Sequence, residues 1–455
     1  MESSYMRYLL FLSFTFLSLQ AITLEESVTY ALENNNALKQ ADVSVERSKS
    51  SRDAKQAQNF GRVDIIASYD HYNLSRTLAP LTPMSIVGSP DGAYQIPTTQ
   101  DLFSAGIAYN VILFNGFAQQ SAYKISDLQY QNAAIRSKLG KEELIYNVRN
   151  LYISLLALQE QLEAQVLYTA SEQRLVERIR KERELGSKSK LDLLRAQNTL
   201  EASKAQEQTM TANIDILKAS LSALMGGHTV NNTESIAISI DEGETSKSEL
   251  DITALKRYQA SELNVKANAR KREQSKAGFY PVIDFGAYYG QNFGPNDTTN
   301  TVPPASTAPT AGQTLIDEGD WNNEEIWQVG VHLKWNILDF GATSSKSEES
   351  KLAYLQAKLE SDNVKIELRK NVITAHSKIK LAVAQFNSAT SQYALLSETE
   401  KIEQIRYDNN ALTLTDLLTT QAKKSLAYAQ MINAKYNYQK AKYYLDYLLE
   451  KGEKQ

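Results

Sequence analysis

The chain has 455 residues, no cysteine and a formal net charge of −4 at pH 7. Without cysteine it has no disulfide framework, no thiolate metal site and no cysteine for a lipid anchor. A mildly acidic chain also lacks the basic surface that phosphate-backbone binding requires, so we expect no nucleic acid among its partners.

The N-terminal hydrophobic run covers residues 9–19, follows Arg7 and is followed by Gln20-Ala21. This arrangement is typical of a secretory signal peptide, so we expect residues 1–21 to be removed by cleavage after Ala21. The alternative is a buried N-terminal helix, which the length of the run disfavours. No later stretch reaches the roughly 18 consecutive apolar residues of a membrane helix. If the mature chain enters a membrane, it therefore does so as strands.

Prolines divide the rest of the chain into regions that allow long helices and regions that do not. All nine lie at positions 80–97 or 281–309, so the residues between and after these two regions contain none. Uninterrupted helices are therefore possible there. A first helix is expected from residue 23 to about residue 60. It begins with a capping box, in which Thr23 and Glu26 satisfy each other's backbone amides.

The longest expected helix covers residues 117 to about 184, which at 1.5 Å per residue is about 100 Å. It ends at a break around Gly186, and a returning helix follows over about 188–225. Apolar residues recur along the long helix at alternating spacings of four and three, the seam of a coiled coil. This seam consists of Leu144, Val148, Leu151, Leu155, Leu158 and Leu162. The long helix therefore needs a partner surface, part of which the returning helix supplies.

Four other segments alternate between apolar and polar residues, as strands with one apolar face do. They cover about 63–72, 103–111, 283–289 and 327–335, with long loops over 73–101 and about 291–325. After the last strand the pattern is again helical, with a returning helix over about 412–450.

The clearest strand runs from Trp327 to Trp335, and its tryptophans bound the apolar face at both ends, as the aromatic girdles of a membrane β-barrel do. Its length is about that needed to cross a bilayer at a tilt. The opposite face carries Gln328, Gly330, His332 and Lys334. We expect the following residues of this strand and of 103–111 to face lipid: Trp327, Val329, Val331, Leu333, Trp335, Phe103, Ile107 and Tyr109.

Four strands cannot close a barrel, and open edges cannot lie in lipid because unpaired backbone groups find no water there. Barrels of this kind have at least about eight strands, so closure requires several chains. Two chains would give eight strands and three would give twelve with room for a lumen. Strand count alone does not choose between them.

The two halves of the chain repeat one another. The segment that begins at Asp192 resembles the one at Asp416, and 416 − 192 = 224. The joints between strand and helix keep the same offset, since Asn115 corresponds to Asp339 and 339 − 115 = 224. Adding this offset to the coiled-coil seam gives residues that are again apolar throughout. We therefore expect a duplication, with one repeat over 22–230 and the other over 231–455.

These motifs, in this order, resemble the TolC-type outer-membrane efflux protein family. The resemblance rests on the duplication, on Gly186 followed by the segment Asp192-Leu193-Leu194-Arg195-Ala196-Gln197, and on four further short segments: Leu113-Phe114-Asn115-Gly116, Ile337-Leu338-Asp339-Phe340-Gly341, Thr23-Leu24-Glu25-Glu26-Ser27 and Ala31-Leu32-Glu33-Asn34-Asn35. It implies an α+β membrane protein: a trimeric, twelve-stranded outer-membrane β-barrel continued by a long α-helical coiled-coil tunnel in the periplasm of a Gram-negative bacterium. It also implies a periplasmic adaptor and an inner-membrane transporter as partners.

The two turns that join the long helices to the returning helices carry the candidate functional residues. Ser189 with Asp192, and Thr413 with Asp416, both fit a capping box at the start of a returning helix. Gly186 and Asn410 would lie in the turns themselves. The family resemblance instead implies that Asp416 and Tyr407 line a periplasmic constriction. For Asp416 the two interpretations remain open.

Enzyme signatures are weak. The triplets at Asp284 and Asp339 spell a kinase metal-binding motif, but neither follows a glycine-rich loop or a catalytic-loop motif. The four histidines show no metal-ligand spacing, so we expect no cofactor, no metal and no catalysis. The chain is predicted to be a passive exit duct for efflux or type I secretion. The alternative is a trimeric coiled-coil surface fibre or adhesin with a β-barrel anchor, which the antiparallel helical returns disfavour.

Overall fold

The structure is a computed structural model that describes residues 21–80, 97–241, 251–297, 319–409 and 411–452. The predicted signal peptide lies outside these residues except for Ala21. The chain divides into two compact units. The first comprises Met1–Glu46, Asn132–Glu262 and Leu359–Gln455, and the second comprises Arg47–Gln131 and Leu263–Lys358. Four helices contribute residues to both units: α2 (Asn36–Ala57), α4 (Ala118–Glu184), α6 (Lys256–Ser275) and α7 (Ala342–Asp408).

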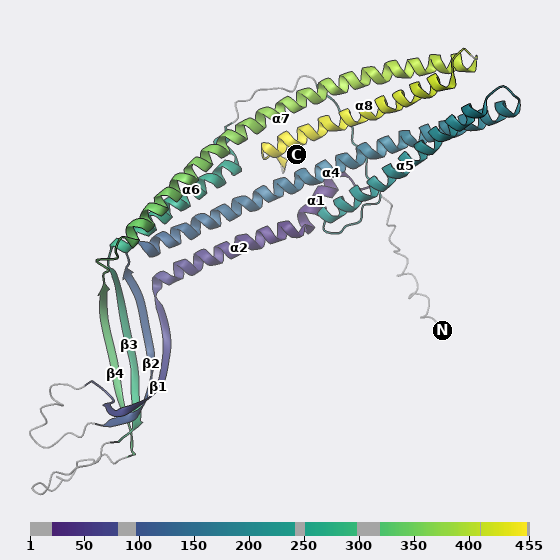
Figure 1. The fold of residues 1–455 in the computed structure, drawn as a ribbon. Helices are drawn as coiled ribbons and strands as arrows, with labels where there is room; N and C mark the ends of the chain where they lie inside the picture. Colours follow the sequence, from purple (N-terminus) through teal and green to yellow (C-terminus); the bar gives the residue numbers. More distant parts are fainter. Residues whose placement is uncertain (1–20, 81–96, 242–250, 298–318, 410, 453–455) are drawn as a thin grey trace, which may run out of the picture. The chain divides into compact units, whose positions relative to one another are not determined.

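The second unit contains a four-stranded antiparallel sheet in the order β1-β2-β3-β4 (Figure 1). Its strands are β1 (Arg62–Thr77), β2 (Thr98–Phe114), β3 (Val282–Pro295) and β4 (Trp321–Lys334). In this order β1 and β4 form the two edges. Each edge strand pairs with a single neighbour among the described residues, so one side of its backbone is left without a strand partner.

The register places the predicted apolar faces of all four strands on one face of the sheet, while Ile66, Ile112 and Ile326 lie on the other. Ile65 lies opposite Ile107, Ile107 opposite Tyr289, and Tyr289 opposite Trp327. Because side chains alternate between faces, matching these positions across each pair aligns every predicted apolar residue of the strands. The one-sided pattern in the sequence is therefore confirmed as a continuous apolar face.

The strands are longer than the alternation predicts, and the two predicted loops are correspondingly shorter. β1 continues to Thr77 and β2 begins at Thr98, while β3 continues to Pro295 and β4 begins at Trp321. The extra residues pair through their backbones, for example Gly294 with Asn322. Backbone pairing does not require an apolar face, so a pattern based on side chains misses these strand ends. The central parts of both loops lie outside the described residues.

The expected single helix over 23–60 is wrong, because the chain breaks at Asn35 into α1 (Leu24–Asn34) and α2 (Asn36–Ala57). The carboxamide of Asn35 explains the break. Its Oδ1 accepts a hydrogen bond of 3.1 Å from the Leu38 backbone amide, and its Nδ2 donates one of 2.9 Å to the Leu224 carbonyl. The Asn35 side chain thus provides a hydrogen-bond partner for a backbone amide at the start of α2 and for a backbone carbonyl at the end of the helix that finishes at Leu224. The predicted capping box at the start of α1 is present.

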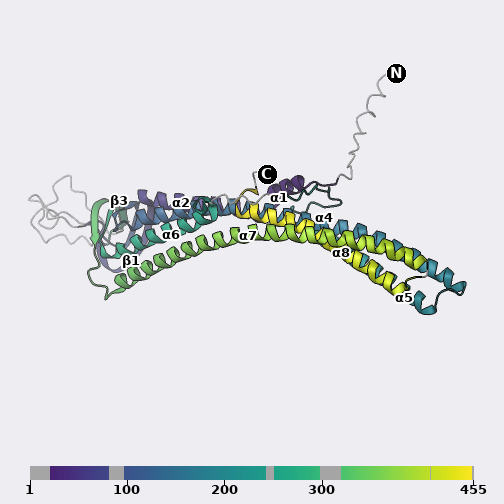
Figure 2. The ribbon, with the colours of Figure 1, turned by 90° about the horizontal axis from the view of Figure 1, so that it is seen from above.

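Two helical hairpins account for most of the first unit. The long helices α4 (Ala118–Glu184) and α7 (Ala342–Asp408) both have 67 residues, and the returning helices α5 (Lys190–Leu224) and α8 (Leu414–Leu448) both have 35. Figures 1 and 2 both draw α5 beside α4 and α8 beside α7. The shorter α6 (Lys256–Ser275) precedes β3. None of the described helices combines the length and the apolar composition that a transmembrane span requires.

The predicted coiled-coil seams are buried, which confirms them. In α4, Leu144, Val148 and Leu155 are at most 7% exposed, and the remaining predicted residues are partly buried and pack against the same core. In α7, the residues 224 positions later are also buried. They are Leu368, Val372, Ala375, Ile379 and Ala382, all at most 9% exposed, with Phe386 half-buried.

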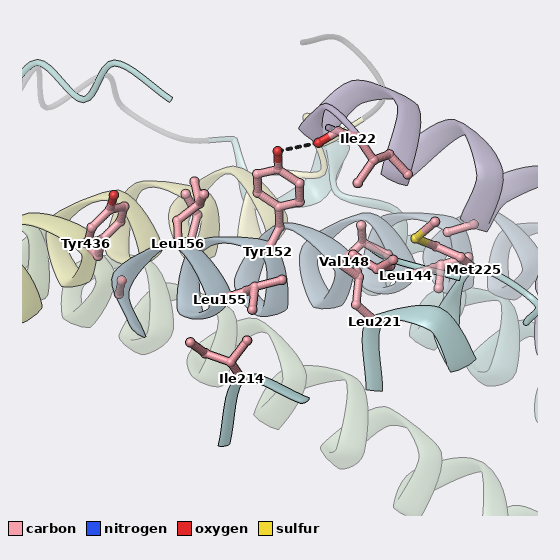
Figure 3. Packing of buried hydrophobic residues seen from close by; sticks show 14 of the residues in the cluster. Ile22, Leu144, Val148, Tyr152, Leu155, Leu156, Ile214, Leu221, Met225 and Tyr436 are labelled. Carbon is pink, nitrogen blue, oxygen red and sulfur yellow. Dashed lines mark hydrogen bonds between the residues drawn. The ribbon is translucent and has the colours of Figure 1, made fainter. Parts of the chain in front are cut away.

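Tyr152 ties this core to two chain segments that are distant in sequence (Figure 3). Its side chain is fully buried, and its hydroxyl lies 2.7 Å from the Ile22 carbonyl oxygen and 2.8 Å from that of Glu234. Ile22 also forms a parallel β-bridge with Thr233. The Tyr152 hydroxyl therefore connects α4 to the segment before α1 and to the segment after α5. Burial raises the pKa of Tyr152 to about 12, so it remains a donor across the physiological pH range.

Replacing Tyr152 by phenylalanine should lower the free energy of unfolding by about 1–2 kcal/mol, because the Ile22 and Glu234 carbonyls both lose the hydroxyl donor and only the Ile22 carbonyl keeps another, the Glu234 amide at 3.0 Å. Thermal unfolding in detergent measures the change. Tyr146→Phe is the matched control, since Tyr146 lies on the same helix, stacks on Tyr447, and its hydroxyl makes no hydrogen bond with the described residues. Equal stability of the two variants would contradict the role assigned to the Tyr152 hydroxyl.

Candidate functional site at the helical hairpin tips

The first hairpin tip turns at Gly186, whose φ of +76° lies in the left-handed region that favours glycine. The Gly186 amide donates to the Arg183 carbonyl and the Ser187 amide to the Glu182 carbonyl, at 3.0 and 2.9 Å. These two bonds satisfy carbonyls at the end of α4. The predicted capping box then begins α5, because the side chains of Ser189 and Asp192 each accept from the other's backbone amide.

The second tip is built on the same plan with different residues. Asn409 donates from its side chain to the Ile405 carbonyl at 2.8 Å, and Ala411 donates to the Arg406 carbonyl at 2.8 Å. Thr413 caps α8: its hydroxyl accepts from the Asp416 amide at 3.2 Å and donates to the Asp416 carboxylate at 2.6 Å. Asp416 is exposed and takes part in this cap. Asn410 lies outside the described residues.

Two arginines join the hairpins to each other near their tips. The Arg178 guanidinium of α4 lies 2.8 Å from the Asp408 carboxylate at the end of α7. The Arg195 guanidinium of α5 donates at 2.9 Å to the Thr415 hydroxyl of α8. Each bond connects residues more than 200 positions apart in the chain. Nothing in the local sequence pattern distinguishes these arginines from others on exposed helix faces, so the sequence does not predict them.

Tyr407 lies inside the tip and makes no hydrogen bond there. It is 3% exposed and belongs to an apolar cluster with residues of α4, α5 and α8. Its hydroxyl is buried and has no hydrogen-bond partner among the described residues. The Lys188 ammonium lies 4.5 Å from the ring centroid, a cation–π contact. Burial raises the pKa of the Tyr407 hydroxyl. The place of Tyr407 at a periplasmic constriction remains a prediction.

Glu172 is a buried acid further along α4 that the sequence pattern did not single out. Its side chain is 0% exposed, and neither carboxylate oxygen has a hydrogen-bond partner among the described residues. Tyr168, one turn earlier, lies beside it and is itself half-buried. Because burial penalises the charged form, the pKa of Glu172 is raised to about 7. Glu172 thus exchanges a proton near neutral pH.

A cavity of about 750 Å³ lies next to this acid, between α4, α7 and α8. Its walls combine tyrosines with acids and one lysine: Tyr168, Tyr393, Tyr428, Tyr436, Glu160, Glu163, Glu400 and Lys424. Most of the charges are paired, since Lys424 lies 3.3 Å from Glu400 and Lys435 lies 3.1 Å from Glu160. Among the described residues, no group of three or more His, Asp or Glu side chains is arranged to hold a metal ion.

The residues expected to face lipid lie on the apolar face of the sheet. Trp327, Val329, Val331 and Leu333 of β4 are 58–70% exposed in the single chain, and Ile107 of β2 is 52% exposed. Phe103 and Tyr109 also belong to β2, and Tyr109 donates to the Phe60 carbonyl at 2.8 Å. Trp335 follows the end of β4 and donates from its indole to the Phe279 carbonyl at 3.2 Å. Contact of this face with lipid remains a prediction.

Comparison with protein families and known structures identifies relatives over most of the chain. The family model described as outer membrane efflux protein matches residues 28–227 and 256–449. A membrane protein from Pseudomonas aeruginosa has a similar fold, with a TM-score of 0.76 and 17% identity over 94% of this chain and 90% of that one. No curated protein sequence matches the chain.

Two further crystal structures have the same fold. The CmeC outer membrane channel of Campylobacter jejuni gives a TM-score of 0.74 and 16% identity, over 94% of this chain and 86% of that one. The outer membrane protein VceC of Vibrio cholerae gives a TM-score of 0.74 and 14% identity, over 94% of this chain and 96% of that one.

The raised pKa of Glu172 predicts a pH-dependent stability. In the unfolded chain this carboxyl ionises near its ordinary value of 4.5, whereas in the folded protein it stays protonated until about pH 7. The folded state therefore loses stability as pH rises between these values, and the loss is complete above the higher one. Glu172→Gln removes the titration, so it should stabilise the protein at about pH 8 by on the order of 2 kcal/mol relative to about pH 5.

Thermal unfolding of both proteins at the two pH values measures this difference. Glu163→Gln alters an exposed glutamate of the same helix and is the matched control, with little change expected at either pH. A stability difference between wild type and Glu172→Gln that is independent of pH would show that Glu172 does not titrate in this range.

Proposed function

We infer that this chain, which belongs to the outer membrane efflux protein family, is the outer-membrane exit channel of an export system in a Gram-negative bacterium. The observation that carries the proposal is the four-stranded sheet, which has one apolar face and two edges without strand partners in the described chain. A sheet of this kind satisfies its backbone in lipid only as part of a closed barrel. The helical hairpins supply the part of the channel on the periplasmic side.

Three chains would close a barrel of twelve strands, which leaves room for a lumen. Aromatic residues near both ends of the apolar face support insertion in a bilayer. Near the loops, the Phe103 ring lies 5.4 Å from that of Phe293 and 5.3 Å from that of Trp321. Tyr109 and Trp335 lie toward the opposite end. Between them the face carries aliphatic residues such as Ile107, Val329 and Val331, interrupted by the aromatic rings of Tyr289, Trp327 and Phe285.

The duplication over 22–230 and 231–455 remains a proposal that the element lengths support. In both halves a strand pair is followed by a 67-residue helix and a 35-residue helix. The joints correspond as well. The Asn115 side chain accepts from the Gln119 amide at the start of α4, and the Asp339 side chain accepts from the Thr343 amide at the start of α7. Each side chain thus accepts from the backbone amide four residues further along the chain and caps the start of the helix that contains it.

The channel is proposed to act as a passive conduit in a tripartite efflux or type I secretion system. Its partners would be a periplasmic adaptor and an inner-membrane transporter, as the family implies. Energy and substrate selection would then come from the transporter, since a duct carries whatever it receives. At the tips, Asp416 and Tyr407 are proposed to form the constriction, with Arg178 and Asp408 holding the two hairpins of one chain together.

Single-channel recording in a planar lipid bilayer tests the function. The purified protein should form discrete, long-lived conducting events, because a twelve-stranded barrel encloses a water-filled lumen. Arg178→Ala breaks the bond between α4 and α7 and should increase the resting conductance. A protein that inserts but passes no current in either form would indicate a filled membrane anchor, as in a surface fibre.

Asp416→Ala separates the two interpretations of the second tip. If three copies of Asp416 surround a narrow axis, they attract cations, and the variant should lose block by divalent cations. Asp192→Ala is the matched control, because it removes the equivalent capping acid of the first tip. Loss of a cap alone would lower stability by about 1 kcal/mol in either variant and leave block unchanged. Unchanged block in Asp416→Ala would therefore assign Asp416 to the cap.

Val331→Lys tests the membrane face. A lysine near the bilayer midplane costs roughly 2–4 kcal/mol, so this variant should assemble poorly in outer-membrane fractions. Gln328→Lys introduces the same side chain on the opposite face of β4 and should assemble normally. Equal assembly of the two variants would contradict the proposed orientation of the sheet.

A further inference from the structure

A second cavity, of about 560 Å³, lies within the unit that contains the sheet, between α4, α6 and α7. Four of its lining residues are basic: Lys124, Lys266, Arg270 and Arg272. Two are acidic, Asp127 and Glu273, and the remaining wall is formed by Leu128, Ala269 and Tyr354. The lining therefore carries four positive and two negative side chains, a net charge of 4 − 2 = +2.

The two acids of the lining do not neutralise the four cations. Asp127 lies 3.8 Å from Arg52, and Glu273 lies 3.2 Å from Lys276, and neither of these partners lines the cavity. Among the residues that the structure describes, the four lining cations have no carboxylate within ion-pair distance and donate no hydrogen bond from their side chains. Like charges gathered around one cavity repel each other unless an anion is shared between them. The cavity is therefore suited to an anionic ligand.

The cavity lies close to the ends of the strands. Lys124 is 124 − 114 = 10 residues beyond Phe114, the last residue of β2, and Arg272 is 282 − 272 = 10 residues before Val282, the first of β3. From the first residue of α4 to Lys124 the helix rises about 9 Å. If the strands cross the outer membrane, as the proposed function requires, these cations lie at the depth of the headgroups of the periplasmic leaflet.

The chemistry of the lining favours a phosphate group. Arginine presents planar, paired donors that match phosphate oxygens, and lysine adds a compact positive charge. Basic pockets at the membrane surface bind the headgroups of anionic lipids in this way. We propose that the cavity between α4, α6 and α7 is a binding site for the phosphate group of an anionic phospholipid of the periplasmic leaflet. The lipid would fill the cavity and anchor the helices that lead out of the sheet.

Native mass spectrometry of the detergent-purified protein tests the site. The protein is titrated with phosphatidylglycerol and, separately, with zwitterionic phosphatidylethanolamine, and sodium phosphate is added as a competitor in a third arm. Lys266→Gln and the double variant Arg270→Gln/Arg272→Gln remove lining cations. Lys271→Gln removes the same charge as Lys266→Gln from an equally exposed position on α6 that does not line the cavity, so it is the matched control.

Phosphatidylglycerol should remain bound to wild type and to Lys271→Gln, while Lys266→Gln should weaken its retention about tenfold, the effect of losing one charge-assisted contact. The double variant should weaken it further, and phosphatidylethanolamine should bind less well than phosphatidylglycerol to wild type. Equal retention by all variants would overturn the site. If millimolar phosphate displaces phosphatidylglycerol, and wild type binds phosphatidylglycerol no better than phosphatidylethanolamine, the lipid assignment is wrong and free phosphate is the ligand.

The result is independent of the channel proposal, because lipid retention and conductance are measured separately. If every variant retains the lipid as wild type does and the protein conducts normally, only the lipid site is overturned. Normal, variant-dependent lipid binding by a protein that conducts no current would overturn the channel and leave the site in place.

Discussion

The outer edges of β1 and β4 each present a row of backbone N–H and C=O groups that no other described strand of the chain pairs with. In water these groups form hydrogen bonds with the solvent, but in hydrocarbon each unpaired group costs several kcal/mol. The apolar face of the same sheet, which extends from Val63 to Leu333 through matched register, requires a nonpolar environment. These two requirements are met together when copies of the chain pair edge to edge around a closed barrel in a membrane.

The helical unit meets a different requirement, because helices of 67 residues are stable only when an apolar stripe is buried along their length. The α4 seam packs against its returning helix α5 and against α8, whereas the α7 seam packs against its returning helix α8 and against the segments around residues 238–240 and 252–258. At the tips, where water reaches the helix ends, caps at Ser189 and Thr413 satisfy the first backbone amides of the returning helices. The ion pair between Arg178 and Asp408 then connects the hairpins.

Periodicity in the sequence was sufficient to predict the strands, their apolar face, the long helices and the buried seams, because each depends on residues that are neighbours within one element. It did not predict the break at Asn35, since that side chain acts on Leu224, a residue distant in sequence. For the same reason it missed the pairing of Arg178 with Asp408 and the burial of Glu172. The joints before α4 and α7 carry Gly116-Phe117 and Phe340-Gly341, in opposite order, and all four residues have positive φ. The backbone shape is therefore kept although the residue order is reversed.

Edge-to-edge closure is the central claim, and the mass of the assembled complex tests it most directly. The purified protein should be measured in mild detergent by light scattering or native mass spectrometry, with the bound detergent subtracted. Three copies per complex, with no folded monomer at any protein concentration, is the result expected from four strands per chain and a twelve-stranded barrel. A well-folded monomer, with both sheet edges unpaired, or a stable dimer would contradict the account.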